Sequence, residues 1–218
     1  MAQHRSIRAI VFDFGGVLTG PIRESITSSL VTHRIDADRY ALVIGEWLAR
    51  ASQAGTPVHR LETGSIAPAE FERLLAAQLV TVDGSPVVPD GLLSRLFGGL
   101  TVLPTMVDLV REIGSLGLRT GLLSNSWGNS YPMTLIDEIF DGAVISGEVG
   151  LRKPDPMIYR MMLERIDVTP EESVFIDDSQ SNTDAATALG MRAILHTDPV
   201  STRARLTELI PTLERPRP

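Results

Sequence analysis

The chain of 218 residues contains no cysteine, so disulfide bonds, cysteine-ligated zinc and thiol catalysis are excluded. Its four histidines are scattered along the sequence, and we therefore expect no histidine-rich metal site. The apolar runs are only a few residues long, which is too short for a membrane-spanning helix.

Basic residues are fewer than acidic residues. The 27 acidic and 20 basic residues give a formal net charge of −7, whereas a nucleic-acid-binding protein needs a basic face. The first residues, 1–8, lead into a short apolar run and lack the long apolar stretch of a secretory signal. We therefore expect a cytoplasmic protein that binds neither nucleic acid nor membranes. The oligomeric state is not indicated.

Lysine is the rarest charged residue. Of the 20 basic residues, 19 are arginine, and the only lysine is Lys153. Chance survival under a codon bias would explain this lysine, and so would a site that requires a compact ammonium group.

Five short apolar runs predict buried strands, because a continuous run rich in Ile and Val fits a sheet that is covered on both faces. They comprise residues 7–12, 119–123, 142–145, 173–176 and 192–195. Helical spacing of apolar residues falls between them, as from Met106 to Leu116, and Asp155 with Pro156 predicts a helix start. This alternation predicts an α/β fold with a doubly wound parallel sheet.

The first two predicted strands are separated by about 105 residues, far more than a simple crossover needs. Most of this surplus has a helical pattern. We expect a small helical cap, residues 19–100, inserted after the first strand of an α/β core that comprises residues 1–18 and 101–218. The clearest helical segments of the cap are residues 39–51, 68–80 and 92–97.

Polar residues follow the predicted strands at the sheet edge where doubly wound proteins bind ligands. Asp13 ends the first strand and is followed by Phe14 and Gly15, whose backbone N–H groups are free to point at an anion. Ser124 and Asn125 end the second strand and offer a hydroxyl and an amide to a phosphate oxygen. Taken singly, each of these residues also fits an ordinary turn.

The fourth strand ends in two adjacent carboxylates, Asp177 and Asp178. They repel each other unless a cation lies between them, and hard cations such as Mg²⁺ prefer such oxygen ligands. The alternative is a helix N-cap beside a solvated neighbour.

In chain order, the set of acid, hydroxyl, lysine and acid pair resembles the haloacid dehalogenase (HAD) superfamily of hydrolases. The resemblance is carried by four segments, VFDFGGVLT (11–19), LLSNS (122–126), GLRKPDPMIY (150–159) and VFIDDSQSNTDAA (174–186). It implies a HAD-type Rossmann-like core. The segment GLRKPDPMIY and the FIDD of the last segment are most similar to a phosphatase subgroup that includes sugar-1-phosphate phosphatases and the N-terminal domains of soluble epoxide hydrolases.

The resemblance also implies a role for each residue. Asp13 would be the nucleophile of a covalent aspartyl intermediate, and Lys153 would neutralise it together with the phosphoryl group. Phosphate binding would involve Phe14, Gly15, Ser124, Asn125, Lys153 and Asn182. Mg²⁺ would be held by Asp13, the carbonyl of Gly15, Asp177 and Asp178. A compact ammonium fits between Asp13 and a phosphate where a planar guanidinium would be too large, which gives the single lysine a reason.

One position departs from the pattern. Phosphatases of the superfamily usually carry a second Asp two residues after the nucleophile, as general acid and base, and this chain has Gly15 there. Dehalogenases also lack that Asp, but they typically lack the paired acids as well. His59 and Glu62 of the cap could supply the missing acid, although we expect them to be solvated surface residues.

The sequence thus predicts a Mg²⁺-dependent phosphatase that acts on a small phosphorylated metabolite and favours activated leaving groups. Two alternatives remain open at this stage. One is a 2-haloacid dehalogenase, in which Asp13 would attack carbon without a metal. The other is a catalytically weakened HAD-like protein with a binding or regulatory role, which only Gly15 supports.

Overall fold

Five parallel strands form a sheet in the order β3-β2-β1-β4-β5 in the computed structural model, which describes residues 6–49, 55–128 and 131–213. The strands are β1 (Ala9–Phe12), β2 (Arg119–Ser124), β3 (Gly142–Ile145), β4 (Ser173–Asp177) and β5 (Arg192–Leu195). Phe12 of β1 lies opposite Leu122 of β2 and Ile176 of β4. The predicted doubly wound α/β fold is confirmed, and the register places the ends of three strands side by side.

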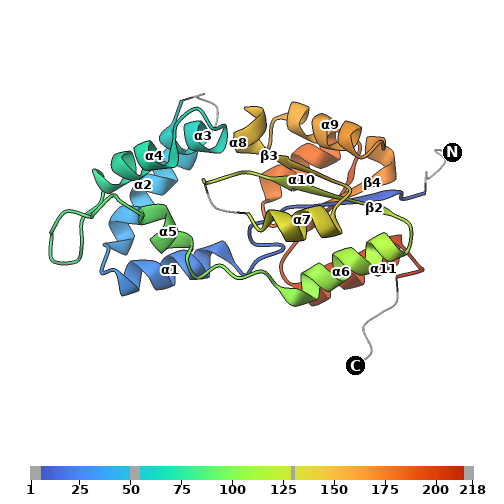
Figure 1. Cartoon of the computed structure of the whole chain (residues 1–218), viewed down its shortest axis with the longest axis horizontal. Coiled ribbons are helices and arrows are strands. Elements are labelled where there is room, and N and C mark those ends of the chain that lie inside the picture. Colours follow the sequence, from blue (N-terminus) through green and yellow to red (C-terminus); the bar gives the residue numbers. More distant parts are fainter. Residues whose placement is uncertain (1–5, 50–54, 129–130, 214–218) are drawn as a thin grey trace.

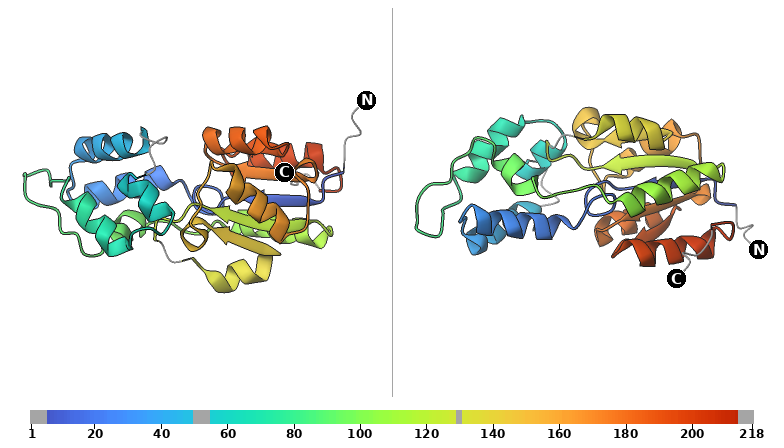
Figure 2. Two further views of the ribbon diagram at one scale, coloured as in Figure 1. Left: turned by 90° about the horizontal axis from the view of Figure 1, so that it is seen from above. Right: turned by 60° about the horizontal axis from the view of Figure 1, so that its bottom comes forward.

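Helices cover both faces of the sheet (Figures 1 and 2). The side chains of Ile10 and Phe12 pack into a cluster with residues of α6, α7 and α11, whereas Ala9 and Val11 pack with residues of α9 and α10. Strand β1 is therefore buried along its whole length, as its unbroken apolar run predicts. The helices after β1 and the insert are α6 (Pro104–Ser115), α7 (Met133–Ile139), α8 (Ser146–Val149), α9 (Pro156–Arg165), α10 (Gln180–Ala188) and α11 (Pro199–Leu209), with a short 3-10 helix at Pro170–Glu172.

Local sequence signals fix where two of these helices start. The Asp155 side chain accepts a hydrogen bond of 2.8 Å from the Met157 N–H at the first turn of α9, and Pro156 takes the first helical position. Pro104 likewise opens α6, whose buried residues recur at helical spacing from Met106 to Ile113. The predicted start of α9 is thus confirmed.

Of the six described helices between β1 and β2, the first five form a separate layer, at the left of Figure 1. They are α1 (Ile22–Thr32), α2 (Ala37–Ala49), α3 (Pro57–Glu62), α4 (Pro68–Ala76) and α5 (Leu92–Phe97). Phe71, Leu75 and Leu92 are fully buried in a hydrophobic cluster of this layer, distinct from the clusters on the two sheet faces. We call these helices the helical insert. The cap and core boundaries given above stay a prediction, which this separate cluster supports.

The two connections to the helical insert run side by side. Thr19 forms an antiparallel bridge with Val102, and the Gly20 N–H donates to the Thr101 carbonyl at 3.1 Å. The Leu103 N–H donates to the Leu18 carbonyl at 2.8 Å. The chain therefore leaves the sheet and returns to it at one place, directly after β1.

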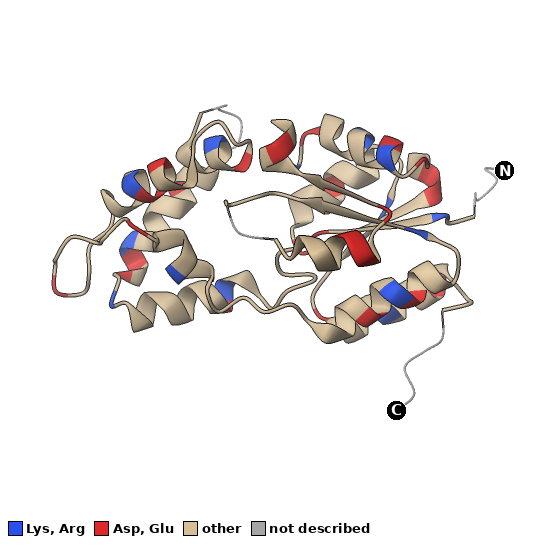
Figure 3. Cartoon of the chain, viewed as in Figure 1, with Lys and Arg blue, Asp and Glu red and all other residues tan. Residues whose placement is uncertain are grey.

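Acidic and basic residues are interspersed along the helices in the view of Figure 3. No helix in the described ranges has the length and apolar character that a membrane crossing requires.

We expect Leu75→Ala to destabilise the helical insert by about 2–5 kcal/mol, because it removes a fully buried side chain and leaves a cavity. Its neighbour Leu74 is 36% exposed, so Leu74→Ala is the matched control and should change stability by less than about 0.5 kcal/mol. Urea unfolding followed by tryptophan fluorescence measures both, because Trp47 and Trp127 pack against this cluster. Equal midpoints for the two variants would contradict the assignment of Leu75 to the core of the insert.

Candidate functional site

A lysine between two carboxylates lies at the centre of the site. The Nζ of Lys153 is 2.9 Å from Oδ1 of Asp13 and 2.6 Å from Oδ2 of Asp177, and it donates to the Leu123 carbonyl at 2.9 Å. The lysine side chain is 1% exposed. Three donors and three oxygen partners satisfy the ammonium completely, so its burial is compensated.

Asp177 is held by further donors. Its side chain is fully buried, and its Oδ1 accepts hydrogen bonds from the Ser179 N–H at 2.8 Å and from Nδ2 of Asn182 at 3.0 Å. The same Nδ2 lies 3.1 Å from Oδ2 of Asp177. Asn182 was predicted to bind phosphate. Its amide instead reaches Asp177, so a phosphate contact by Asn182 stays a prediction.

Burial and mutual repulsion shift the acidity of the carboxyl groups. Burial raises the pKa of Asp13 to about 7, Lys153 opposes that shift, and the charges of Asp177 and Asp178 add to it. Loss of solvation raises the pKa of Asp178 to about 6, with a further contribution from Asp177. For Lys153, burial alone would lower the pKa, but Asp13 and Asp177 raise it above its ordinary value. The site thus carries more negative charge than one ammonium neutralises.

These carboxylates fit a divalent cation. Asp13, Asp177 and Asp178 each offer an oxygen, and the three oxygens lie within 4.8 Å of one another. Gly16 brings the backbone against this group, because a Cβ at residue 16 would stand 2.3 Å from Oδ2 of Asp178 and its φ of +74° favours glycine. Oxygen donors with a surplus of negative charge are the ligands that Mg²⁺ takes.

The predicted phosphate-binding residues lie around the same strand ends. Oδ1 of Asp13 also accepts a hydrogen bond of 2.7 Å from the Phe14 N–H. The Asn125 side chain clamps the Lys153 backbone from both sides, accepting from its N–H at 2.8 Å and donating to its carbonyl at 3.1 Å. The Ser124 hydroxyl lies 3.0 Å from the hydroxyl of Tyr131. Tyr131 is a site residue that we did not predict, because no motif marks a tyrosine seven positions after Ser124.

Gly15 differs from Gly16 in what surrounds it. A Cβ at residue 15 would stand 2.7 Å from Cδ1 of Ile22, the first residue of α1. An isoleucine methyl group therefore occupies the space into which a second Asp would start to project. A side chain at position 15 would therefore require Ile22 to move, and this chain has glycine where phosphatases of the superfamily usually have Asp.

His59 and Glu62 were expected to be solvated, and this expectation is wrong. They are 5% and 4% exposed. The Glu62 carboxylate accepts hydrogen bonds from Nε1 of Trp127 at 3.0 Å and from Nε of Arg152, and its backbone carbonyl accepts one from Ser146. Because α3 packs against α8, this glutamate joins the helical insert to the loops that follow Ser124 and precede Lys153.

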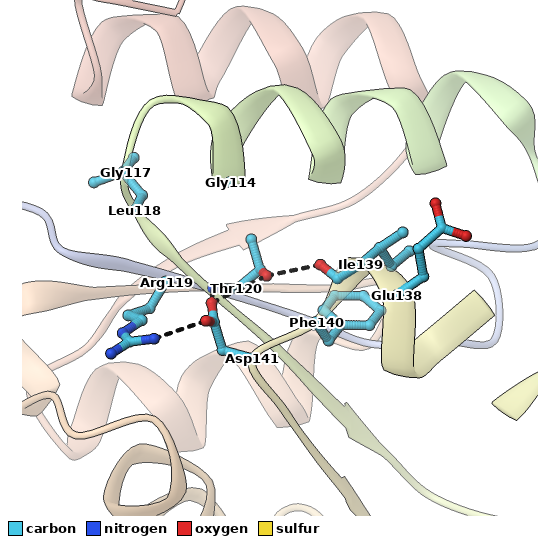
Figure 4. Close-up of a pocket in the computed structure, with 9 residues that line it drawn as sticks. All are labelled: Gly114, Gly117, Leu118, Arg119, Thr120, Glu138, Ile139, Phe140 and Asp141. Atoms are coloured by element: carbon cyan, nitrogen blue, oxygen red, sulfur yellow. Dashed lines mark hydrogen bonds and ion pairs between the residues drawn. The ribbon is translucent and has the colours of Figure 1, made fainter. Parts of the chain in front are cut away.

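Another hollow lies at the opposite, amino end of β2, and Figure 4 shows its lining. It contains an exposed ion pair of 2.8 Å between Arg119 and Asp141, and Thr120 donates to the Ile139 carbonyl. These contacts join β2 to the segment before β3. None of the predicted site residues lines this hollow.

The family follows from comparison with known proteins. The model of the haloacid dehalogenase-like hydrolase family matches residues 7–190, which include every residue of the site. The chain belongs to this family of hydrolases. The resemblance noted in the sequence is thereby confirmed, as is the assignment to an enzyme class.

Three relatives illustrate the kinds of protein to which this chain is similar. The chain is 26% identical to the sesquiterpene phosphatase astK of Aspergillus oryzae, with 94% of this chain and 97% of that protein covered. It is 27% identical to the D-ribitol-5-phosphate phosphatase of Bacteroides thetaiotaomicron, covering 94% and 98%. It is also 31% identical to mouse acyl-CoA dehydrogenase family member 10 over 87% of this chain, but spans only 18% of that protein. A HAD-like hydrolase structure from Porphyromonas gingivalis superimposes with a TM-score of 0.67 at 25% identity, covering 93% and 98%.

We expect Lys153→Met to destabilise the protein by about 3–5 kcal/mol, because it leaves Asp13 and Asp177 as buried carboxylates without their cation. The double variant Lys153→Met/Asp177→Asn should recover part of that loss, since one of the two buried charges is removed. Urea denaturation at pH 7 measures both. If Lys153→Met unfolds at the same urea concentration as the parent, the ion pairs do not stabilise the fold.

Proposed function

We propose that this hydrolase cleaves phosphomonoesters through an aspartyl-phosphate intermediate on Asp13. The observation that carries the proposal is the buried Asp13–Lys153–Asp177 arrangement with Asp178 beside it. A phosphoryl group brings negative charge to an already acidic site. Binding this group requires nearby positive charge. Lys153 supplies one such charge, and Asp13, Asp177 and Asp178 would supply another by holding Mg²⁺.

The chemistry follows from the two oxygens of Asp13. Oδ1 is oriented by Lys153 and the Phe14 N–H, whereas Oδ2 has no hydrogen bond from the described residues and is the oxygen we assign to attack. It forms a bond to phosphorus as the phosphorus–oxygen bond to the alcohol breaks. Water then attacks phosphorus, inorganic phosphate leaves, and the Asp13 carboxylate is regenerated.

The metal ligands we propose are Asp13, the carbonyl of Gly15 and Asp178. Asp177, which Lys153 and Asn182 already hold, would bind the metal either directly or through a water molecule. When bound, Mg²⁺ supplies positive charge that offsets the phosphoryl oxygens. The residues of the chain position the nucleophile and hold Lys153 in place.

Gly15 bears on the choice of substrate. A positioned general acid contributes about 10²- to 10⁴-fold when the leaving alkoxide needs a proton. At position 15 this chain has no side chain to supply it, and Glu62 is engaged with Trp127 and Arg152. We therefore propose a preference for activated phosphates, such as aryl, acyl or anomeric sugar phosphates. Slow hydrolysis of the aspartyl phosphate should then produce a burst of leaving group before steady turnover.

The relatives support phosphatase chemistry, and they are named for a terpene and a polyol phosphate. The dehalogenase alternative is disfavoured by the acid pair, since displacement of a halide needs no cation at Asp177 and Asp178. Action on a small phosphorylated metabolite and a cytoplasmic location remain predictions from the sequence.

Asp13→Asn should lower the release of phosphate from phenyl phosphate by several orders of magnitude while the fold survives, because the amide keeps the shape but removes the nucleophilic charge. The matched control is Asp137→Asn on the exposed side of α7, which should keep full activity. Phosphate release is measured with Mg²⁺ and with EDTA. Near-normal turnover by Asp13→Asn would exclude the assigned nucleophile. Halide release from a 2-haloacid, in EDTA and without phosphatase activity, would support the dehalogenase.

Restoring the second Asp should increase activity on poor leaving groups, provided that the obstructing methyl group is removed. Ile22→Val deletes Cδ1, the atom 2.7 Å from the position of a Cβ at residue 15. We expect Gly15→Asp/Ile22→Val to raise kcat/KM for an alkyl phosphate by about tenfold or more relative to phenyl phosphate. Ile22→Val alone is the control. An unchanged ratio in the double variant would show that another group already donates the proton.

A further inference from the structure

A small chamber adjoins the proposed phosphate site. It has a volume of about 150 Å³ and borders Gly15, Ser124 and Asn125, which follow Asp13 and end β2. If the phosphate of a substrate binds between Asp13 and these residues, its ester oxygen lies beside the chamber. The group that leaves the phosphate would therefore occupy it.

The walls of the chamber are mostly hydrocarbon. The apolar and aromatic side chains come from the segments that follow β1 and β2 and from the helical insert with its return connection, and they include Phe14, Ile22, Ile26, Phe97, Leu100 and Tyr131. No charged side chain of the described residues lines it.

The polar groups in these walls are already paired within the protein. The Ser124 hydroxyl bonds that of Tyr131, the Asn125 amide clamps the Lys153 backbone, and Nε1 of Trp127 donates to Glu62. A polyol entering the chamber would lose water from its hydroxyl groups without gaining equivalent partners, which is unfavourable. A hydrocarbon group has no such loss.

Ile22 connects the apolar character of the chamber with the absence of an acidic side chain at position 15. Its Cδ1 occupies the space beside Gly15, so the position that carries an acid in many relatives of this fold is here part of an apolar wall. A cavity of about 150 Å³ lined by aliphatic and aromatic groups is large enough for a benzene ring. One ring, or a branched chain of five or six carbons, therefore matches the chamber.

We propose that this chamber binds the hydrocarbon part of the leaving group, so that, among phosphomonoesters whose leaving groups are equally activated, those of apolar alcohols about the size of 3-methylbutanol or benzyl alcohol are preferred over those of polyols and sugars. The proposal rests on the phosphatase function argued above. It assigns Ile22 and Ile26 of α1 as specificity-determining residues.

The test compares 3-methylbutyl phosphate with glycerol 1-phosphate. Both are esters of primary alcohols with the same number of heavy atoms beyond the ester oxygen, and the hydroxyl groups make glycerol the better leaving group. Leaving-group activation thus favours glycerol 1-phosphate, whereas the chamber favours the other ester. We expect kcat/KM in Mg²⁺ to be about tenfold or more higher for 3-methylbutyl phosphate, because each methylene in an apolar pocket contributes about tenfold or more.

Ile26→Asn should reduce this preference by about tenfold, because it places an amide in the wall. Val31 lies on the same helix but is 74% exposed and outside the chamber, so Val31→Asn should leave the ratio unchanged. Should Ile26→Asn fail to fold, the substrate ratio of the parent protein still decides the matter.

Binding is also measured without turnover. In a Trp47→Phe variant, Trp127 is the remaining tryptophan and lines the chamber. Benzyl alcohol should shift its fluorescence with saturation, whereas glycerol at the same concentration should not.

Equal or greater kcat/KM for glycerol 1-phosphate would overturn this inference and leave the phosphatase assignment standing. Failure to release phosphate from either ester or from phenyl phosphate would overturn the phosphatase assignment. In that case an absent response of Trp127 to benzyl alcohol would reject the chamber as well, and a saturable response would retain it as an apolar binding site.

Discussion

The arrangement of the strand ends depends on one buried ammonium group. Lys153 bonds to Asp13 at the end of β1, to the Leu123 carbonyl in β2 and to Asp177 at the end of β4, so it joins three neighbouring strands. Its burial would be very unfavourable without these partners, and the two carboxylates would repel each other without it. The same charge balance favours the proposed chemistry, because a carboxylate beside a cation and a surplus of carboxylate oxygens suits an anionic substrate and a divalent metal.

Much of this could be predicted from the sequence, because the relevant signals are local. The five apolar runs predicted all five strands of the described sheet, and the polar residues at three of the strand ends marked Asp13, Ser124 and Asp177 as candidate site residues. Helix α3 starts at a Thr56–Pro57 capping signal, but at six residues it is too short to show helical periodicity, as is α8 at four residues, and the two helices contact each other. The burial of Glu62 was missed for a related reason. Its partners Trp127 and Arg152 are distant in the sequence, and no local pattern distinguishes a glutamate that pairs across an interface from one in water.

The contact between the helical insert and the sheet concerns the same loops as the chemistry. Glu62 holds Trp127, three residues after Ser124, and Arg152, which precedes Lys153. Trp127 in turn packs edge-on against Phe71 and Phe97 of the insert. The insert thereby contributes walls to the apolar chamber and also braces the backbone that presents the serine and the lysine. Specificity and positioning are consequently shared between the two layers.

The paired connections at Thr19 and Val102 have a consequence for how such a protein can change over time. Because the chain enters and leaves the helical insert at adjacent points, a replacement segment of any length needs only to begin and end there, and the sheet need not rearrange to accept it. Asp13, the proposed nucleophile, lies a few residues upstream of this junction, and Lys153, Asp177 and Asp178 come after it. Genetic exchange at a single locus could therefore renew the substrate-facing walls while transmitting the reactive groups intact.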